Sequence, residues 1–234
     1  KYDDAKTVTL DLLSRLDTDI AAMNGDADGF GTADIIYGGN VGKWQKFANS
    51  LRLKLAMVIA DIDPGTAGAK IAASAALPLI TANADNALFK YVGAPNKNPL
   101  SNDVPPRSAR QDFVMANTLV DEMNTLNDPR RAAYFTTVGG EYVGGKYGFS
   151  NVYANFSTFS TKVTATTFPG NMLDASEVNF LLAEAVERGF ITGDAKSYYD
   201  AAITASLAYW GVTGVEDYLA QATVDYSNAG SGAS

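Results

Sequence analysis

Apolar residues recur every three or four positions along much of the chain, the spacing that places them on one face of an α-helix. This pattern predicts helices over about 4–23, 41–60, 67–77, 175–188, 195–210 and 214–222. A capping box, Ser108-x-x-Gln111, predicts a further helix that ends at Asn127. Thr66 and Asp174 are the expected N-caps of the helices that follow them. The chain is therefore expected to be mainly all-α.

Residues 130–160 depart from the helical pattern. They contain two Gly-Gly pairs and eight Tyr or Phe residues. Within them, AYFTTV-GG-EYV predicts a β-hairpin, because Gly-Gly supplies the positive φ angles that a two-residue turn requires. Residues 225–234 are small and polar and are expected to form a frayed tail. Since no Pro-rich or Gly/Ser linker divides the chain, we predict a single domain over 1–234 with a loop-and-hairpin excursion at 130–160.

Two of the predicted helix pairs resemble the tetratricopeptide repeat, in which large apolar residues of one helix meet small residues of the next. One pair matches six positions without a gap, at Leu182, Ala183, Val186, Ala195, Tyr199 and Ala202. The other pair matches well in its first helix, at Trp44, Phe47, Ala48 and Leu51. Its second helix matches at Ala67, Ile71 and Ser74 only after an insertion of seven residues. We therefore expect tetratricopeptide-like helical hairpins in an α-α superhelix with long loops.

The stretch GKWQKFANSLRLKLAMVIADIDP, residues 42–64, has a second interpretation as a basic helix on a membrane or an acidic partner. A helix that lies on a surface needs an unbroken polar face. Here only the first three turns have one, and the segment 51–60 is apolar nearly all round except for Arg52 and Lys54. Packing between neighbouring helices is the favoured interpretation. Trp44 and Trp210 are likewise expected to be packing residues rather than sugar platforms.

Composition removes several classes of function. The net charge of −8 argues against nucleic-acid binding, which needs a surplus of Lys and Arg on one face. With no Cys and no His, thiolate nucleophiles, Ser-His pairs and most zinc sites are excluded, and no cofactor is predicted. The chain begins KYDD, without an initiator Met, a signal segment or an apolar run long enough for a membrane span. We interpret it as a processed or trimmed piece.

Two acidic patterns resemble functional sites, but a structural interpretation is favoured for each. Asn24-x-Asp26-x-Asp28-Gly29 resembles the start of a calcium loop, but the twelfth position, which should be Glu, is Ile35. An Asx/Gly loop is favoured and no metal site is predicted. Glu177 and Glu184 would suit a glycosidase pair only if both were free, whereas Glu177 is expected to cap a helix. No catalytic residue is predicted.

Three blocks of the sequence carry a family resemblance. ADIIYGGNVGKWQKFANSLRLKLAM (33–57), SEVNFLLAEAVERGF (176–190) and YYDAAITASLAYWGV (198–212) resemble the SusD/RagB family, in its SusD-like branch of Bacteroidetes outer-membrane lipoproteins. NADNALFKY (83–91) and NDPR (127–130) agree in order and rough spacing. The chain lacks the family's signal peptide, its lipid-bearing Cys and its first helices, and ends before the usual C-terminal helices. The resemblance therefore implies a fragment.

The resemblance implies a cell-surface protein without enzymatic activity. Such a protein captures a glycan or oligosaccharide, or sometimes a peptide as RagB-like members do, and passes it to a TonB-dependent SusC-like transporter. It implies attachment to the outer membrane only through a lipid that this chain does not carry. The alternative function is a helical-repeat scaffold that binds a protein partner.

The aromatic segment is the predicted ligand site, because sugar faces stack on exposed rings while amides bond the hydroxyls. The predicted ligand-binding residues are Tyr134, Tyr142, Tyr147, Asn151, Tyr153, Asn155 and Phe156. About half of the rings in the segment are expected instead to pin the loop to the helices. The loop 79–104 is a weaker alternative, and its polar residues Asn96, Lys97, Asn98 and Asn102 are more simply explained as turn residues.

Overall fold

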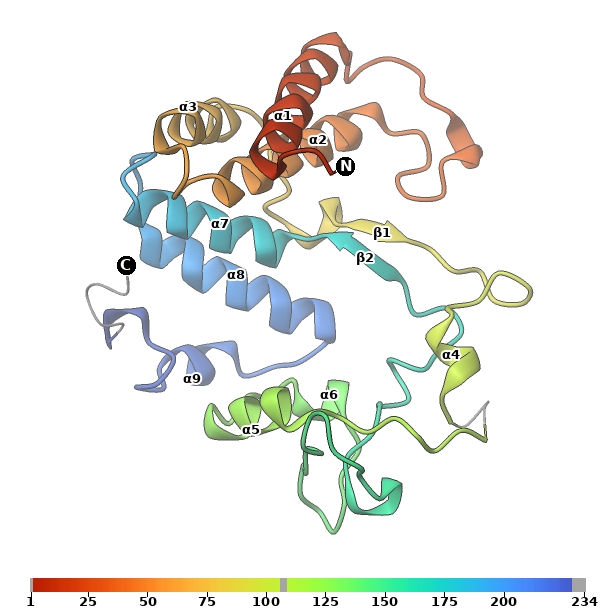
Figure 1. Ribbon diagram of the computed structural model, residues 1–234. Helices are drawn as coiled ribbons and strands as arrows, with labels where there is room; N and C mark the ends of the chain where they lie inside the picture. The colour runs from red at the N-terminus through yellow and green to blue at the C-terminus, as the bar shows by residue number, and fades with distance from the viewer. Residues whose placement is uncertain (1, 106–108, 229–234) are drawn as a thin grey trace. The chain divides into compact units, whose positions relative to one another are not determined.

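The computed structural model describes residues 2–105 and 109–228 (Figure 1). The chain forms two compact units. The first consists of Lys1–Phe89 and Asn171–Ser206, and the second of Lys90–Gly170 and Leu207–Ser234. Within the described residues, no helix is both long enough and apolar enough to cross a membrane. The prediction of one domain over 1–234 stays a prediction.

The first unit is helical, as the apolar spacing predicts. It contains α1 (Ala5–Ala22), α2 (Val41–Val58), α3 (Pro64–Ala75), α7 (Ala175–Glu187) and the start of α8 (Ala195–Trp210), with short 3-10 turns at Gly31–Ala33 and Asn83–Asp85. Asp174 caps α7 as predicted, since its side chain accepts a hydrogen bond from the N–H of Glu177. The expected cap of α3 is wrong. Asp63 caps that helix because Pro64, whose fixed φ suits the first helical position, starts it before Thr66.

Small residues let the helices of the first unit approach one another, as the repeat pattern predicts. Ala48 of α2 and Ala67, Ile71 and Ser74 of α3 are all buried. Figure 1 shows α7 and α8 side by side, and the rings of Phe180 and Tyr199 meet edge to face with centroids 5.7 Å apart. These helices form the mainly all-α, tetratricopeptide-type fold expected from the sequence.

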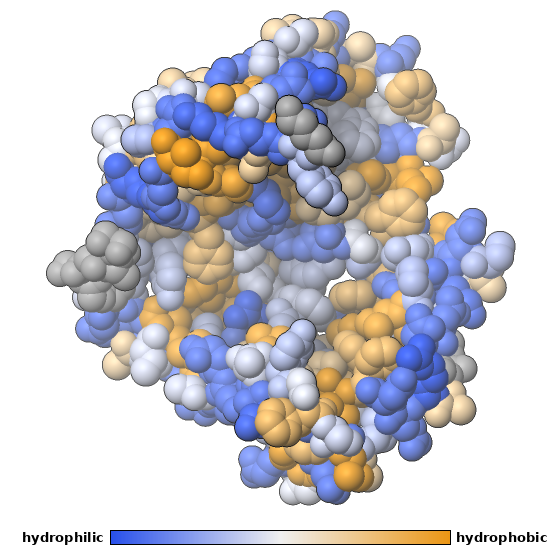
Figure 2. Space-filling model, in the orientation of Figure 1, coloured by the Kyte–Doolittle hydropathy of each residue, from blue (hydrophilic) through white to orange (hydrophobic). Residues whose placement is uncertain are grey.

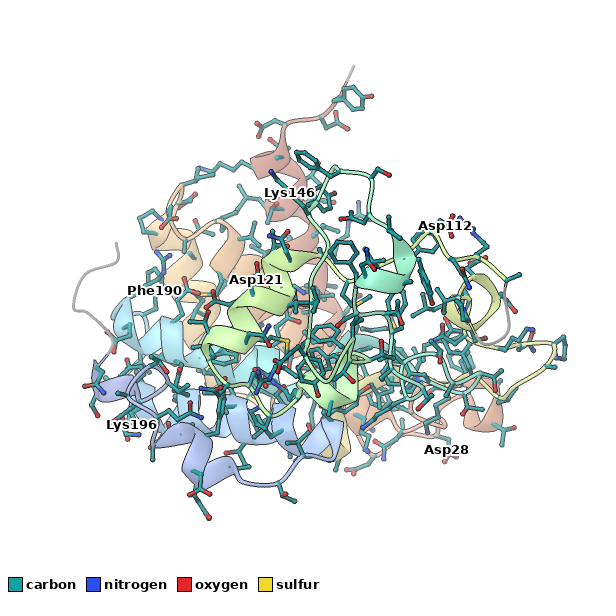
Figure 3. All side chains as sticks on the ribbon, turned by 90° about the horizontal axis from the view of Figure 1, so that it is seen from below. Asp28, Asp112, Asp121, Lys146, Phe190 and Lys196 are labelled. Carbon is teal, nitrogen blue, oxygen red and sulfur yellow. The ribbon has the colours of Figure 1, made fainter. Side chains whose placement is uncertain are left out.

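One glycine marks how close α3 lies to the segment after α7. A Cβ atom built on Gly68 would stand 3.0 Å from the ring of Phe190, which Figure 3 labels. Even the methyl group of an alanine at position 68 would require that ring to shift by a few tenths of an ångström. The residue is thus selected for space rather than for backbone freedom.

A buried guanidinium joins the first three helices. Arg52 of α2 is only 5% exposed. It donates to Ser74 Oγ of α3 at 2.9 Å, to Asp17 Oδ1 of α1 at 2.9 Å and to Asn49 Oδ1 at 2.8 Å. Lys70 also contacts the Asp17 carboxylate. Burial alone would raise the pKa of Asp17, but the hydrogen bonds from Lys70 and Arg52 outweigh it and lower that pKa.

The second unit is built mostly of loops with short helices. These are α4 (Leu100–Asp103), α5 (Asn117–Thr125), α6 (Arg131–Tyr134), α9 (Val215–Leu219) and the 3-10 turns Tyr153–Asn155 and Tyr226–Asn228. Its small apolar cluster contains Val120, Met123 and Phe135. Asp128, which is 1% exposed, accepts from the backbone N–H and the guanidinium of Arg130 and from the hydroxyl of Tyr218.

Three expectations for the less regular parts need correction. The helix predicted from Ser108 begins at Asn117, and residues 109–115 are not helical. Ser108 itself lies outside the described residues. The Gly139-Gly140 turn forms with both φ angles positive, but its hairpin is reduced to a single bridge between Val138 and Glu141. The two-stranded sheet pairs β1 (Ala87–Phe89) with β2 (Gly170–Leu173) instead.

The predicted frayed tail, 225–234, falls partly outside the described residues. Its first part is ordered, since Tyr226–Asn228 forms a 3-10 turn and the N–H of Asn228 donates to the carbonyl of Asp225. Residues 229–234 lie outside the described range.

Replacing Arg52 by Met keeps the aliphatic packing and removes three hydrogen bonds, one of which is also an ion pair. We expect this change to lower the free energy of unfolding by about 2–3 kcal/mol, because Asn49 and Ser74 stay buried without their donor. Urea denaturation of the full chain measures it. The matched control is Arg15→Met, since Arg15 and its partner Asp11 are largely exposed and their pair should contribute less than about 1 kcal/mol. Equal losses for the two variants would contradict the importance of the buried network.

The stability contribution of Asp128 should depend on pH. Burial raises the pKa of this carboxyl, but bonding to Arg130 outweighs burial and holds the pKa below its usual value. The charged form is therefore favoured in the folded protein, so its contribution is full above about pH 4 and is lost as pH falls through the lowered pKa. We expect Asp128→Asn to cost about 2 kcal/mol at pH 7 and progressively less in acid. A cost that is constant from pH 7 to pH 2 in denaturation experiments would refute this account.

Candidate functional site

Three separated segments of the second unit are joined through their backbones. The N–H of Met115 donates to the carbonyl of Ser157 at 2.8 Å, and the N–H of Gly145 donates to the carbonyl of Met115 at 2.7 Å. The N–H of Ser157 in turn donates to the carbonyl of Val143 at 2.8 Å, and the N–H of Val143 donates to Ser157 Oγ at 2.9 Å. The aromatic segment predicted to bind ligand is thereby fixed to the strand-like residues before α5.

The second glycine pair makes this arrangement sterically possible. A Cβ on Gly144 would lie 2.3 Å from the Cα of Asn117, and one on Gly145 would lie 2.6 Å from Val114 Cγ2. Neither distance is tolerable for a real side chain. The two Gly-Gly pairs therefore serve different purposes: the first forms a turn, and the second lets two backbones touch.

A pocket of about 220 Å³ opens beside these joined segments. Its lining combines aromatic rings, threonine hydroxyls and one cation, provided by Arg110, Phe113, Thr136, Tyr153, Thr158, Phe159, Thr161 and Thr164, together with Val104 and Pro105. Thr136 Oγ1 and Thr158 Oγ1 are hydrogen-bonded at 3.1 Å. Pockets for small molecules usually measure about 300–1,000 Å³. This pocket is therefore suited to one end of a longer ligand.

The cation of the pocket is held in place by its neighbours. Arg110 Nη2 lies 2.7 Å from Asp112 Oδ2, and its guanidinium sits 4.7 Å from the ring centroid of Phe113. The hydrogen bond from Arg110 lowers the pKa of Asp112, and the same bond raises the pKa of Arg110. A guanidinium fixed over an aromatic ring presents N–H groups at a defined position to hydroxyl acceptors.

The structure divides the seven predicted ligand residues among several environments. Tyr134 packs against Trp210, with ring centroids 4.2 Å apart, and is half-buried. Tyr142 packs on the apolar cluster, with the Arg131 guanidinium 5.4 Å from its ring centroid. Both rings therefore fasten loops to the unit. Within the part of the chain that the structure describes, Tyr153 is the one of the seven residues that lines this pocket.

The remaining predicted residues lie on loops outside the pocket. Tyr147 is 80% exposed. On the face of the molecule that Figure 2 shows, apolar residues in orange are interspersed with polar residues in blue. Asn151 shapes the loop that carries Tyr147, because its side chain accepts from the N–H of Lys146 and donates to the carbonyls of Lys146 and Phe149. Figure 3 labels Lys146 on it. Asn155 is exposed and Phe156 half-buried. As a ligand-binding set, the seven residues stay a prediction.

Sequence reasoning missed Arg110, Phe113 and the threonines of the pocket. The expected helix from Ser108 would have placed Arg110 and Phe113 on helical turns, whereas they precede α5 in a segment without regular secondary structure. The threonines come from positions up to 28 residues apart, Thr136 to Thr164. A signal was present in the sequence, because residues 157–167, STFSTKVTATT, are rich in threonine.

The other candidate sites have structural partners. The Asn24 side chain accepts from the N–H of Asp26, which closes an Asx turn. Among the described residues, no group of three or more carboxylates stands close enough to hold a metal ion. Glu177 pairs with Lys54 at 2.6 Å, and Glu184 pairs with Arg188 at 2.7 Å.

Asn98 of the loop 79–104 and the tryptophan Trp44 also have structural partners. Asn98 is nearly buried, donates to the carbonyl of Phe168 and accepts from the N–H of Leu100, as a turn residue does. Trp44 Nε1 donates to Asp34 Oδ2 at 2.7 Å, and its ring packs edge-on against Phe47. Burial raises the pKa of Asp34, but four N–H donors outweigh it and lower that pKa to about 2.

Comparison with known families and structures gives a consistent result. The model of the SusD-like family, described as starch-binding and associating with the outer membrane, matches residues 1–233. A SusD homologue from Bacteroides uniformis superposes with a TM-score of 0.83 at 34% identity, over 94% of this chain and 48% of its own. No protein of curated function matches the sequence.

Two further solved structures agree. A SusD-like protein from Bacteroides thetaiotaomicron superposes with a TM-score of 0.78 at 31% identity, over 94% of this chain and 47% of its own. A chitin-binding SusD homologue from Flavobacterium johnsoniae does so with a TM-score of 0.83 at 30% identity, over 94% and 48%. The chain thus spans about half the length of the solved structures it matches. With a family model that covers nearly every residue, this chain belongs to the SusD-like family.

Proposed function

We propose that this chain is the glycan-binding part of a cell-surface nutrient-binding protein. The observation that carries the proposal is the pocket that joins Tyr153, Phe113 and Arg110 to four threonine hydroxyls in one fixed loop assembly. Membership of a family described as starch-binding supports it, as does the similarity to a chitin-binding homologue. The proposed activity is binding without catalysis.

The pocket has the chemistry that a pyranose requires. A sugar ring carries an apolar face of C–H groups, which stacks on Tyr and Phe rings, and a rim of hydroxyls. The hydroxyls of Thr136, Thr158 and Thr161 can exchange hydrogen bonds with these groups, and Arg110 offers donors alone. The hydroxyl of Thr164 already donates to the carbonyl of Ser160. Because the pocket is small, it would hold a terminal sugar while the rest of the glycan extends outside it.

We further propose a place for the protein at the outer membrane, beside a SusC-like TonB-dependent transporter that receives the glycan. The family description, which includes association with the outer membrane, supports this location. A lipid attached elsewhere in a longer polypeptide would provide the anchor. A helical-repeat scaffold for a protein partner, including a peptide ligand of the RagB kind, is the competing function.

Tyr153→Ala should weaken glycan binding. Loss of one stacking ring is expected to cost about 1–2 kcal/mol, or roughly tenfold in affinity for maltohexaose or chitohexaose. Isothermal titration calorimetry with the full chain measures this. Tyr153→Phe keeps the ring and should bind within about threefold of the parent chain, whereas Tyr2→Ala removes a fully exposed ring outside the pocket and should change nothing. Unchanged binding in Tyr153→Ala and Phe113→Ala would rule out the pocket.

Transfer to a transporter predicts an association that does not need sugar. A SusC-like protein from the same cells should co-purify with the lipid-anchored full-length protein in the absence of glycan. Tyr153→Ala should leave this association intact while reducing glycan uptake by the cells, because the proposal places the transporter contact outside the pocket. If a peptide or another protein competes with maltohexaose for Tyr153, the scaffold or peptide-binding function replaces the proposed one.

A further inference from the structure

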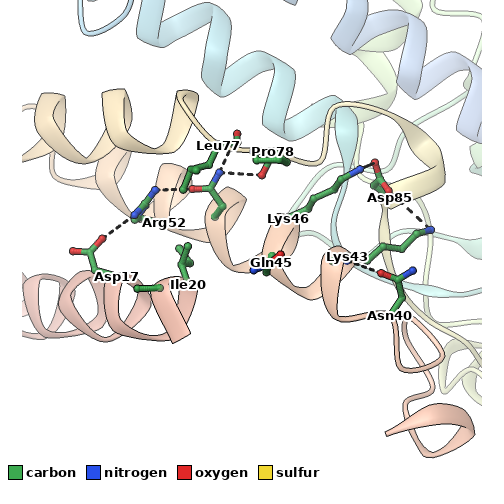
Figure 4. A pocket seen from close by; sticks show the side chains of 13 residues that line it. Asp17, Ile20, Asn40, Lys43, Gln45, Lys46, Arg52, Leu77, Pro78 and Asp85 are labelled. Carbon is green, nitrogen blue, oxygen red and sulfur yellow. Dashed lines mark hydrogen bonds and ion pairs between the residues drawn. The ribbon is translucent and has the colours of Figure 1, made fainter. Parts of the chain in front are cut away.

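A second cavity, of about 680 Å³, lies within the first unit between α1, α2 and the segment that follows α3 (Figure 4). Its volume falls in the range of about 300–1,000 Å³ that is usual for small-molecule sites. Ile20, Leu77 and Pro78 give it an apolar wall. The pocket around Tyr153 belongs to the other unit, so this cavity is a separate feature.

Charged side chains are gathered at the two ends of the cavity. Figure 4 shows Asp17 and Arg52 at one end and Lys43, Lys46 and Asp85 at the other. The first end is already satisfied, because the Arg52 guanidinium is buried and its three hydrogen bonds go to Ser74, Asp17 and Asn49. A ligand can therefore gain little there.

At the other end, two lysines share a single carboxylate. Lys46 Nζ lies 2.6 Å from Asp85 Oδ2, and Lys43 Nζ lies 4.0 Å from Asp85 Oδ1 and 2.5 Å from the carbonyl of Ala84. The side chains of the lysines are 34% and 32% exposed, whereas that of Asp85 is only 14% exposed. All three side chains line the cavity, the lysines being more exposed than the carboxylate, and two cations against one carboxylate give this end a net positive charge.

The position of this charge is unusual for such an acidic chain. The protein as a whole has a net charge of −8, so a local excess of cations is not a consequence of composition. Each ammonium has three N–H donors. Within the described residues Lys46 donates to one acceptor, Asp85, so an ammonium that lines the cavity keeps further hydrogen-bonding capacity. An anionic group placed between the two lysines would balance the excess and accept these bonds.

We propose that this cavity binds an acidic saccharide, with a carboxylate or sulfate group beside Lys43 and Lys46 and its sugar ring against Ile20, Leu77 and Pro78. That the ligand is a saccharide rests on the proposed function. That it is anionic rests on the paired lysines, independently of the Tyr153 pocket.

Calorimetry of the full chain with tetragalacturonate and with a sulfated tetrasaccharide, both at low ionic strength, tests the proposal and distinguishes carboxylate from sulfate. Replacing both lysines, Lys43→Met with Lys46→Met, should weaken binding of the preferred probe by about tenfold or more. Lys46→Arg keeps the charge and should stay within about threefold. Raising the salt to 0.5 M should weaken binding, because the contact is electrostatic and partly exposed.

Two matched variants sharpen the test. Asp85→Asn removes the competing carboxylate, so it should tighten binding of the acidic probe by about threefold or more. Lys54→Met is the control, because Lys54 lies on the same helix and pairs with Glu177 at 2.6 Å but does not line the cavity, and it should have no effect. Thermal melts of each variant separate loss of a site from loss of the fold.

The outcomes separate this inference from the proposed function. If maltohexaose or chitohexaose binds through Tyr153 but neither acidic probe binds, the inference fails and the proposed function stands. If an acidic probe binds equally well to the double lysine variant, or more weakly to Asp85→Asn, the assignment of this cavity is wrong. If no saccharide of any kind binds, both proposals fail.

Discussion

The helical unit depends on one buried cation that three helices share. Arg52 is a charged residue in the apolar part of α2, where removal from water is costly unless every donor is matched. The match requires Asp17, Asn49 and Ser74 to converge from α1, α2 and α3. Apolar contacts are tolerant of sliding, but a guanidinium fork is directional. The network therefore specifies the register of the three helices, while the small residues around it supply the close packing.

The loop unit is specified differently, by main-chain pairing between distant segments. With few buried apolar side chains, it relies on the hydrogen bonds of Met115 with Gly145 and Ser157, and on the absence of a side chain at Gly144. Main-chain bonds fix loops without restricting most side chains. The side chains at the rim of the Tyr153 pocket thus do not determine the course of the loops that carry them.

Local sequence signals predicted the helices well, since apolar spacing and caps such as Asp174 act within a few residues. They failed where distant groups decide the structure. A helix was predicted from Ser108 because its capping box is a local signal, whereas the backbone beyond it pairs with residues more than 25 positions away. Composition directed attention to the aromatic segment and hence to Tyr153. Composition could not show that Arg110 and Thr164 line one pocket, or that Lys43 lies near Asp85, because these residues come together only in the folded chain.

The carboxylate of Asp85 determines how strongly an anion must bind in order to occupy the cavity beside Lys43 and Lys46. A ligand with negative charge must compete with an acceptor that the fold already holds beside both lysines. Small anions such as chloride or acetate would gain too little to displace it. A saccharide that adds the contact of its ring to its charge would gain enough. The internal competitor thus converts a general attraction for anions into discrimination in favour of large ones.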